Sequence, residues 1–105
     1  MKVLITSTGN TANANFDLRF GRAGWYCIYD TEDASTSFIE NENKDRQGGA
    51  GTKAAEQVAA LGVKKVISGD FGPKAKDLLN QFSIQMVILQ KQDTTVQDVI
   101  DQLKK

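Results

Sequence analysis

The sequence predicts an α/β domain built on a mixed, mainly parallel sheet of about five strands, with helices on both faces. Two observations lead to this fold class. Strand-like and helix-like segments follow one another in the order β-β-β-α-β-α-β-α, and an early hairpin precedes a series of β-α-β units. At 105 residues the chain forms one domain, residues 1–105, with room for a single modest core.

The first half of the chain supplies three strands. Lys2–Ser7, "KVLITS", is a continuous apolar run of the kind that lies in the middle of a sheet. The β-rich stretches at 24–30, "GWYCIYD", and 35–40, "STSFIE", are separated by the turn-like "TEDA" and predict a hairpin. The second strand is therefore expected to be antiparallel. The polar loop "TGNTANANFDLRF" forms no regular element.

The second half alternates helices with strands. Residues 51–61 carry apolar residues at helical spacing, and Gly62 follows where a helix often ends in glycine. A short strand at 65–68, "KVIS", precedes a helix with Pro73 in its first turn. Residues 85–89, "QMVIL", form the last strand.

The final helix is expected to begin near Thr94 or Thr95. The stretch "TTVQD" offers two capping boxes, Thr94 with Gln97 or Thr95 with Asp98, and the sequence does not choose between them. Apolar residues then recur at helical spacing up to Leu103.

Composition excludes several classes of function. Lys and Arg together number 13, as do Asp and Glu, so no broad basic surface for nucleic acid or membrane is expected. Histidine is absent and cysteine occurs once, which removes the usual zinc and iron sites and histidine-dependent nucleophilic catalysis. With one cysteine, no stretch of 18 apolar residues and no apolar leader, a cytoplasmic location is expected.

A glycine cluster, "RQGGAGTK", lies directly before the first helix. It matches neither the P-loop pattern nor G-x-G-x-x-G. Free backbone N–H groups at a helix start nevertheless attract anions, and glycine lets a ligand approach them. The expected anion-binding residues at this start are Gly48, Gly49, Ala50, Gly51 and Thr52.

The three arginines strengthen this expectation, since Arg19, Arg22 and Arg46 all lie in or beside "RFGR" and "RQGGAG". If both segments meet at one sheet edge, the arginines would ring one pocket. The alternative is that the glycines only turn the chain and the arginines are solvated. Cys27, in the middle of an aromatic strand, is expected to be a buried structural thiol.

The chain resembles the dinitrogenase iron–molybdenum cofactor biosynthesis family. Members of that family share an F-G-R-A segment, an aromatic strand, a G-G-A-G helix start, a helix ending in G-V and a G-x-x-G-P-x-A turn. The corresponding stretches here are "RFGRAGWYCIYD" and "GGAGTKAAEQVAALGVKKVISGDFGPKA". The match runs in register over nearly the whole chain.

The resemblance implies a ribonuclease H-like fold without nuclease chemistry. It also implies a non-enzymatic carrier for an anionic iron–sulfur or molybdenum–iron–sulfur cluster, with cluster-assembly proteins as partners. Its F-G-R segment adds Phe20 to the expected binding residues beside Arg19 and Arg22. Many members carry a histidine directly before F-G-R; Arg19 stands there in this chain and offers charge and hydrogen bonds but no bond to a metal.

Two other classes of function remain open from the sequence. One is a cofactor-free regulatory or protein-interaction domain of the same fold. The other is an enzyme that uses carboxylates and a divalent metal, which needs several acids at one sheet edge. Only Asp17 and Asp70 stand near the relevant loops, so an enzyme is not expected.

Overall fold

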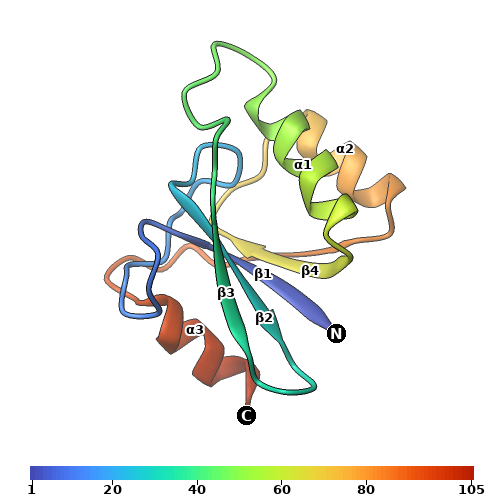
Figure 1. Cartoon of the computed structure of the whole chain (residues 1–105). Helices are drawn as coiled ribbons and strands as arrows, with labels where there is room; N and C mark the ends of the chain where they lie inside the picture. The colour runs from blue at the N-terminus through green and yellow to red at the C-terminus, as the bar shows by residue number, and fades with distance from the viewer.

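The structure, a computed structural model, describes residues 1–105 (Figure 1). The strands are β1 (Lys2–Ser7), β2 (Trp25–Asp30), β3 (Thr36–Glu40), β4 (Val63–Ser68) and β5 (Gln85–Ile88). The helices are α1 (Ala50–Ala60), α2 (Pro73–Gln81) and α3 (Val96–Leu103). None of these helices is long and apolar enough to span a membrane.

The five strands form one sheet in the spatial order β3-β2-β1-β4-β5. β2 runs antiparallel to both β1 and β3, whereas β1, β4 and β5 are parallel to one another. The predicted α/β fold with a five-stranded mixed sheet is therefore confirmed. Because β1 lies at the centre of the sheet, its "VLITS" residues are all buried.

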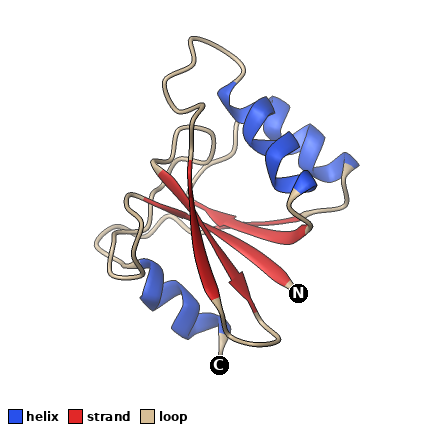
Figure 2. Cartoon of the chain, in the orientation of Figure 1, coloured by secondary structure: helices blue, strands red, loops and turns tan.

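Helices cover the two faces unequally, with α1 and α2 side by side on one face and α3 on the other (Figures 1 and 2). Successive side chains of β1 point to opposite faces of the sheet, as the pleat of a strand requires. Leu4 packs in the core beneath α1 and α2, and Val3 and Ile5 pack in the core beneath α3. The sheet thus separates two apolar cores.

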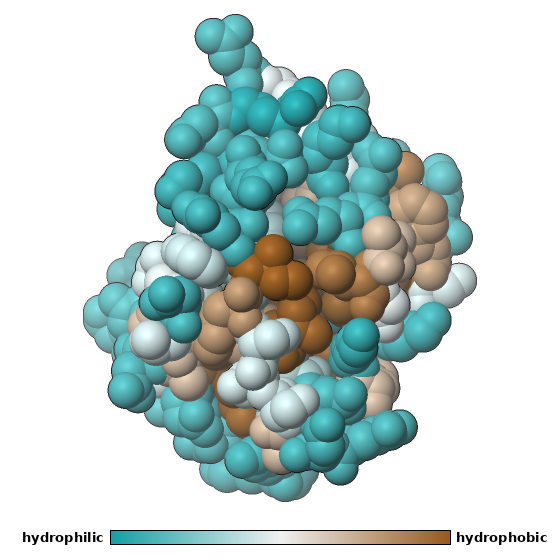
Figure 3. Space-filling model, in the orientation of Figure 1, coloured by the Kyte–Doolittle hydropathy of each residue, from teal (hydrophilic) through white to brown (hydrophobic).

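Part of the first core reaches the surface. In Figure 3 apolar residues gather in the middle of the visible face and hydrophilic residues surround them. The partly buried hydrophobic residues packed against this core are Ile39, Ala59, Leu61, Leu78 and Met86. The upper part of the same view, where α1 begins in Figure 1, is hydrophilic.

Observed and predicted boundaries differ by one or two residues. α1 spans 50–60 rather than 51–61, and β4 begins at Val63 rather than at residue 65. Gly62 has the positive φ of 76° expected after a helix end, so the chain turns at once into the strand. Val63 is then already buried, which extends β4 backward.

The start of α3 resolves the two capping alternatives in favour of Thr95. The Thr95 hydroxyl accepts from the backbone N–H of Asp98 at 3.1 Å, and the Asp98 carboxylate accepts from the backbone N–H of Thr95 at 3.1 Å. The same carboxylate accepts from the Thr94 hydroxyl at 3.3 Å. These hydrogen bonds lower the pKa of Asp98.

Replacing Thr95 by alanine should lower the free energy of unfolding by about 1 kcal/mol, because one helix-start N–H loses its acceptor. Urea denaturation followed by circular dichroism would measure this loss. Thr95→Ser keeps the hydroxyl and should retain most of the stability. If the alanine and serine variants were equally stable, the capping box would contribute nothing.

Candidate functional site

The start of α1 leaves backbone donors free. Gly49 is the N-cap residue with a left-handed φ of 74°, and no side chain caps the helix. The first intrahelical hydrogen bond runs from the N–H of Lys53 to the carbonyl of Gly49 at 2.9 Å. The N–H groups of Ala50, Gly51 and Thr52 therefore have no acceptor in the helix, as the glycine cluster predicted.

The loop at 19–22 packs directly onto this helix start. A Cβ placed on Gly21 would lie 2.7 Å from the backbone N and 2.8 Å from the Cα of Gly51. The buried Asn41 side chain donates to the carbonyls of Gly21 at 2.9 Å and Ala23 at 2.8 Å. The Tyr26 hydroxyl donates to the Phe20 carbonyl at 2.8 Å. The loop is therefore held by Tyr26 of β2 and by Asn41, which directly follows β3.

Arg19 is oriented by a buried carboxylate. Its Nε and Nη2 donate to the two carboxylate oxygens of Asp17, each at 3.1 Å, and the pair raises the pKa of Arg19. Asp17 is 4% exposed and also accepts from the backbone N–H groups of Arg19 and Gly24. The Arg19 side chain itself is 65% exposed, so part of the guanidinium remains open to solvent.

The other two arginines hold loop carbonyls. Arg22 Nη1 donates to the carbonyl of Lys44 at 2.7 Å, and Arg46 Nε donates to the carbonyl of Gly48 at 3.2 Å. Both bonds are exposed. Each arginine thus steadies the segment that leads into α1.

A hollow of about 370 Å³ lies where these segments meet. Its lining residues are Arg19, Phe20, Gly21, Arg22, Gly49, Ala50, Gly51, Asp70 and Gly72. Six residues predicted from the sequence are thereby brought together. Gly48 and Thr52 do not line the hollow. Neither does Arg46, so the expectation that all three arginines surround one pocket is wrong for Arg46.

The start of α2 borders the same hollow, a feature that the sequence analysis missed. Gly72 is the N-cap residue of α2, Pro73 occupies the first turn, and no side chain caps this helix. The N-cap residue of α2 therefore lies at the same hollow as the start of α1, although Pro73 itself has no backbone N–H to donate. The G-x-x-G-P-x-A turn that carried the resemblance could have indicated this second start.

A second hollow, of about 320 Å³, shares Arg19 and Arg22 with the first. Its lining residues are Thr8, Asp17, Arg19, Arg22, Gly24, Lys44 and Asp45, none of them hydrophobic. Lys44 adds a third cation that the sequence analysis did not single out. The two arginines therefore stand between two polar hollows.

Two residues singled out from the sequence prove to be core residues. The Phe20 side chain is 2% exposed, and its ring centroid lies 5.1 Å from that of Phe71 and 6.1 Å from that of Tyr26. Cys27 is fully buried, and burial raises the pKa of its thiol to about 12. Phe20 thus forms the floor of the site by packing, and the thiol is closed to ligands.

The donor set of this site suits an anion rather than a bare metal ion. No group of three His, Cys, Asp or Glu side chains in the chain could hold a metal ion. The hollow instead offers guanidinium and amide N–H groups, which bind the oxygen or sulfur atoms of an anion through hydrogen bonds.

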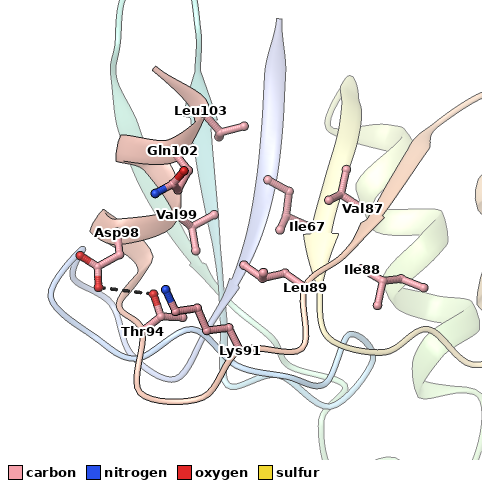
Figure 4. Close-up of a pocket in the computed structure, with 10 residues that line it drawn as sticks. All are labelled: Ile67, Val87, Ile88, Leu89, Lys91, Thr94, Asp98, Val99, Gln102 and Leu103. Carbon is pink, nitrogen blue, oxygen red and sulfur yellow. Dashed lines mark hydrogen bonds between the residues drawn. The ribbon is translucent and has the colours of Figure 1, made fainter. Parts of the chain in front are cut away.

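A larger hollow, of about 480 Å³, lies elsewhere, between α3 and the strands β4 and β5 (Figure 4). Its walls are mainly apolar, with Ile67, Val87 and Leu89 facing Val99 and Leu103. Two of its polar residues, Thr94 and Asp98, take part in the hydrogen bonds that cap the start of α3. It contains none of the binding residues predicted from the sequence.

The fold and the polar hollows define a small α/β domain whose charged loops converge on the starts of two helices. The chain belongs to the dinitrogenase iron-molybdenum cofactor family, whose sequence profile matches residues 1–105. The resemblance inferred from the sequence motifs is therefore confirmed.

Solved structures agree with this assignment. The apo form of the orange protein from Desulfovibrio gigas is 25% identical, with a TM-score of 0.90, and the match covers 98% of this chain and 86% of that one. A Thermotoga protein provisionally described as NifB and assigned to the DUF35 family is 29% identical, with a TM-score of 0.84 and the same coverages.

A sequence relative comes from Methanocaldococcus jannaschii. This uncharacterized protein is 30% identical over 77 residues, which make up 70% of this chain. The match spans 65% of the relative's own length, slightly less than two thirds.

Proposed function

We propose that this protein is a non-enzymatic carrier of an anionic iron–sulfur or molybdenum–iron–sulfur cluster, built on a ribonuclease H-like domain. One observation carries the proposal: Arg19, Arg22 and the uncapped start of α1 line one hollow. The family context supports it, as does the relative from Desulfovibrio gigas, which is described as an apo form.

The chemistry of the hollow matches such a cargo. Metal–sulfide clusters present anionic sulfur atoms, which accept hydrogen bonds from guanidinium and amide N–H groups. The dipole of α1 adds a partial positive charge at the same place. Because no cysteine or histidine is free to coordinate a metal, the cluster would be held by charge and hydrogen bonds alone. Such binding lets a carrier release its cargo to a cluster-assembly partner.

Anaerobic reconstitution tests this proposal. The purified protein is incubated with tetrathiomolybdate, or with iron and sulfide, passed through a desalting column and analysed for metal, sulfide and visible absorption. We expect metal and sulfide to elute with the protein and to give a visible chromophore. Protein that elutes colourless and metal-free after every mixture would favour the cofactor-free interaction domain instead.

A further inference from the structure

Asp70 is the one acidic side chain among the residues that line the 370 Å³ hollow. It follows β4, lines the 370 Å³ hollow beside the starts of α1 and α2, and is exposed. The hollow's other charged side chains are Arg19 and Arg22. Asp70 therefore places one anionic acceptor at the site that we propose for an anion.

No partner within the chain neutralises this carboxylate. The ion pairs of the chain involve Asp17, Asp30 and Glu32, not Asp70. Asp70 also caps neither helix, since both α1 and α2 lack a side-chain cap. A carboxylate beside free helix-start N–H groups would ordinarily bind them; here both the acceptor and the donors remain open to a ligand.

We propose that Asp70 determines which anions this pocket accepts. An anion whose surface offers only acceptor atoms meets repulsion from Asp70 while it binds Arg19 and Arg22. An anion that also carries a proton donor or an exposed metal cation can turn this donor or cation toward Asp70. It then binds Arg19, Arg22 and Asp70 together. Like charges brought together raise specificity by penalising the wrong ligand.

This inference rests on the proposed function and narrows its ligand. The cargo would be a metal–sulfide anion with a hydrosulfide group or a metal cation on one side. The acceptor-only surface of sulfate or tetrathiomolybdate would suit the pocket less well.

Sulfate and monohydrogen phosphate make a matched pair of probes. At about pH 8 both are tetrahedral dianions, and only the phosphate carries a proton that it can donate to a carboxylate. Isothermal titration at low ionic strength should show that the unmodified protein prefers phosphate. Asp70→Asn should raise the affinity for sulfate and for tetrathiomolybdate about fivefold, and should shrink the preference for phosphate.

Asp77→Asn is the matched control, because Asp77 is exposed on α2 and does not line the hollow. It removes the same charge and should change neither affinity. If Asp70→Asn and Asp77→Asn gave the same affinities, or if sulfate and phosphate gained equally in Asp70→Asn, the role of Asp70 would be overturned.

The outcomes also separate this inference from the proposed function. Tetrathiomolybdate binding that needs Arg22 but ignores Asp70 would overturn the inference and leave the carrier in place. An Asp70→Asn effect on phosphate and sulfate, in a protein that never retains a cluster, would support the inference and overturn the carrier. If no anion bound to the unmodified protein or to the Asp70→Asn variant, both the inference and the carrier proposal would be overturned.

Discussion

Alanine in place of Gly21 is expected to lower the free energy of unfolding by about 1–3 kcal/mol. The added Cβ would lie 2.7 Å from the backbone N of Gly51, closer than real Cβ contacts come. The obstacle is the backbone of α1, which cannot move aside as a flexible side chain could. The loop or the helix start must shift, and the hollow between them must change shape. Anion binding should therefore weaken together with stability.

Gly48→Ala is the control for this experiment. Gly48 lies two residues before α1, has nothing within 4 Å of a built Cβ and does not have a positive φ. Alanine there should leave stability within about 0.5 kcal/mol of the original or raise it slightly, because it restricts the unfolded chain. Urea unfolding of the two variants makes the comparison. Equal stabilities would show that the 19–22 loop does not press on α1.

The fold could be predicted because local patterns and tertiary packing agree in this chain. The apolar run of β1 predicted a central strand, and β1 lies between β2 and β4. Gly62 predicted a helix end, and it has the positive φ that such an end requires. The start of α3 was ambiguous because Thr94 and Thr95 both offer a hydroxyl. Tertiary contacts helped to settle it, since the backbone N–H of Val96 donates to the carbonyl of Ala14, far away in sequence.

The site was less predictable because it depends on contacts between distant segments. The neighbouring sequence does not distinguish Arg46 from Arg22, since both lie near glycines in a loop. Only Arg22 lines the two polar hollows. The sequence gives no indication that Asn41 fixes the 19–22 loop, because the two carbonyls to which it donates lie about 20 residues earlier in the chain. Phe20 was expected at the site through the F-G-R segment, and it does line the hollow, but its aromatic ring is buried in the core and does not point out as a ligand-binding group.

Arg22→Ala is expected to weaken the binding of tetrathiomolybdate about tenfold to a hundredfold. Hydrogen bonds from a charged group contribute about 1.5–3 kcal/mol, and each 1.4 kcal/mol corresponds to a factor of ten in affinity. Arg22 lines both polar hollows. Only its Nη1 donates within the chain, to the Lys44 carbonyl, which leaves its other N–H groups for a ligand. Arg22→Lys should recover only part of the affinity, because an ammonium group lacks the planar fork of a guanidinium.

Arg46→Ala separates a site effect from a loss of net charge. Arg46 matches Arg22 in charge and also donates one exposed hydrogen bond to a loop carbonyl, but it lines neither hollow. Both alanine variants should lower the melting temperature slightly, since each loses one exposed hydrogen bond. Only Arg22→Ala should weaken binding strongly. If Arg22→Ala bound tetrathiomolybdate as well as the original protein and only melted at a lower temperature, Arg22 would serve to hold the loop. The carrier proposal would then lose one of the two arginines on which it rests.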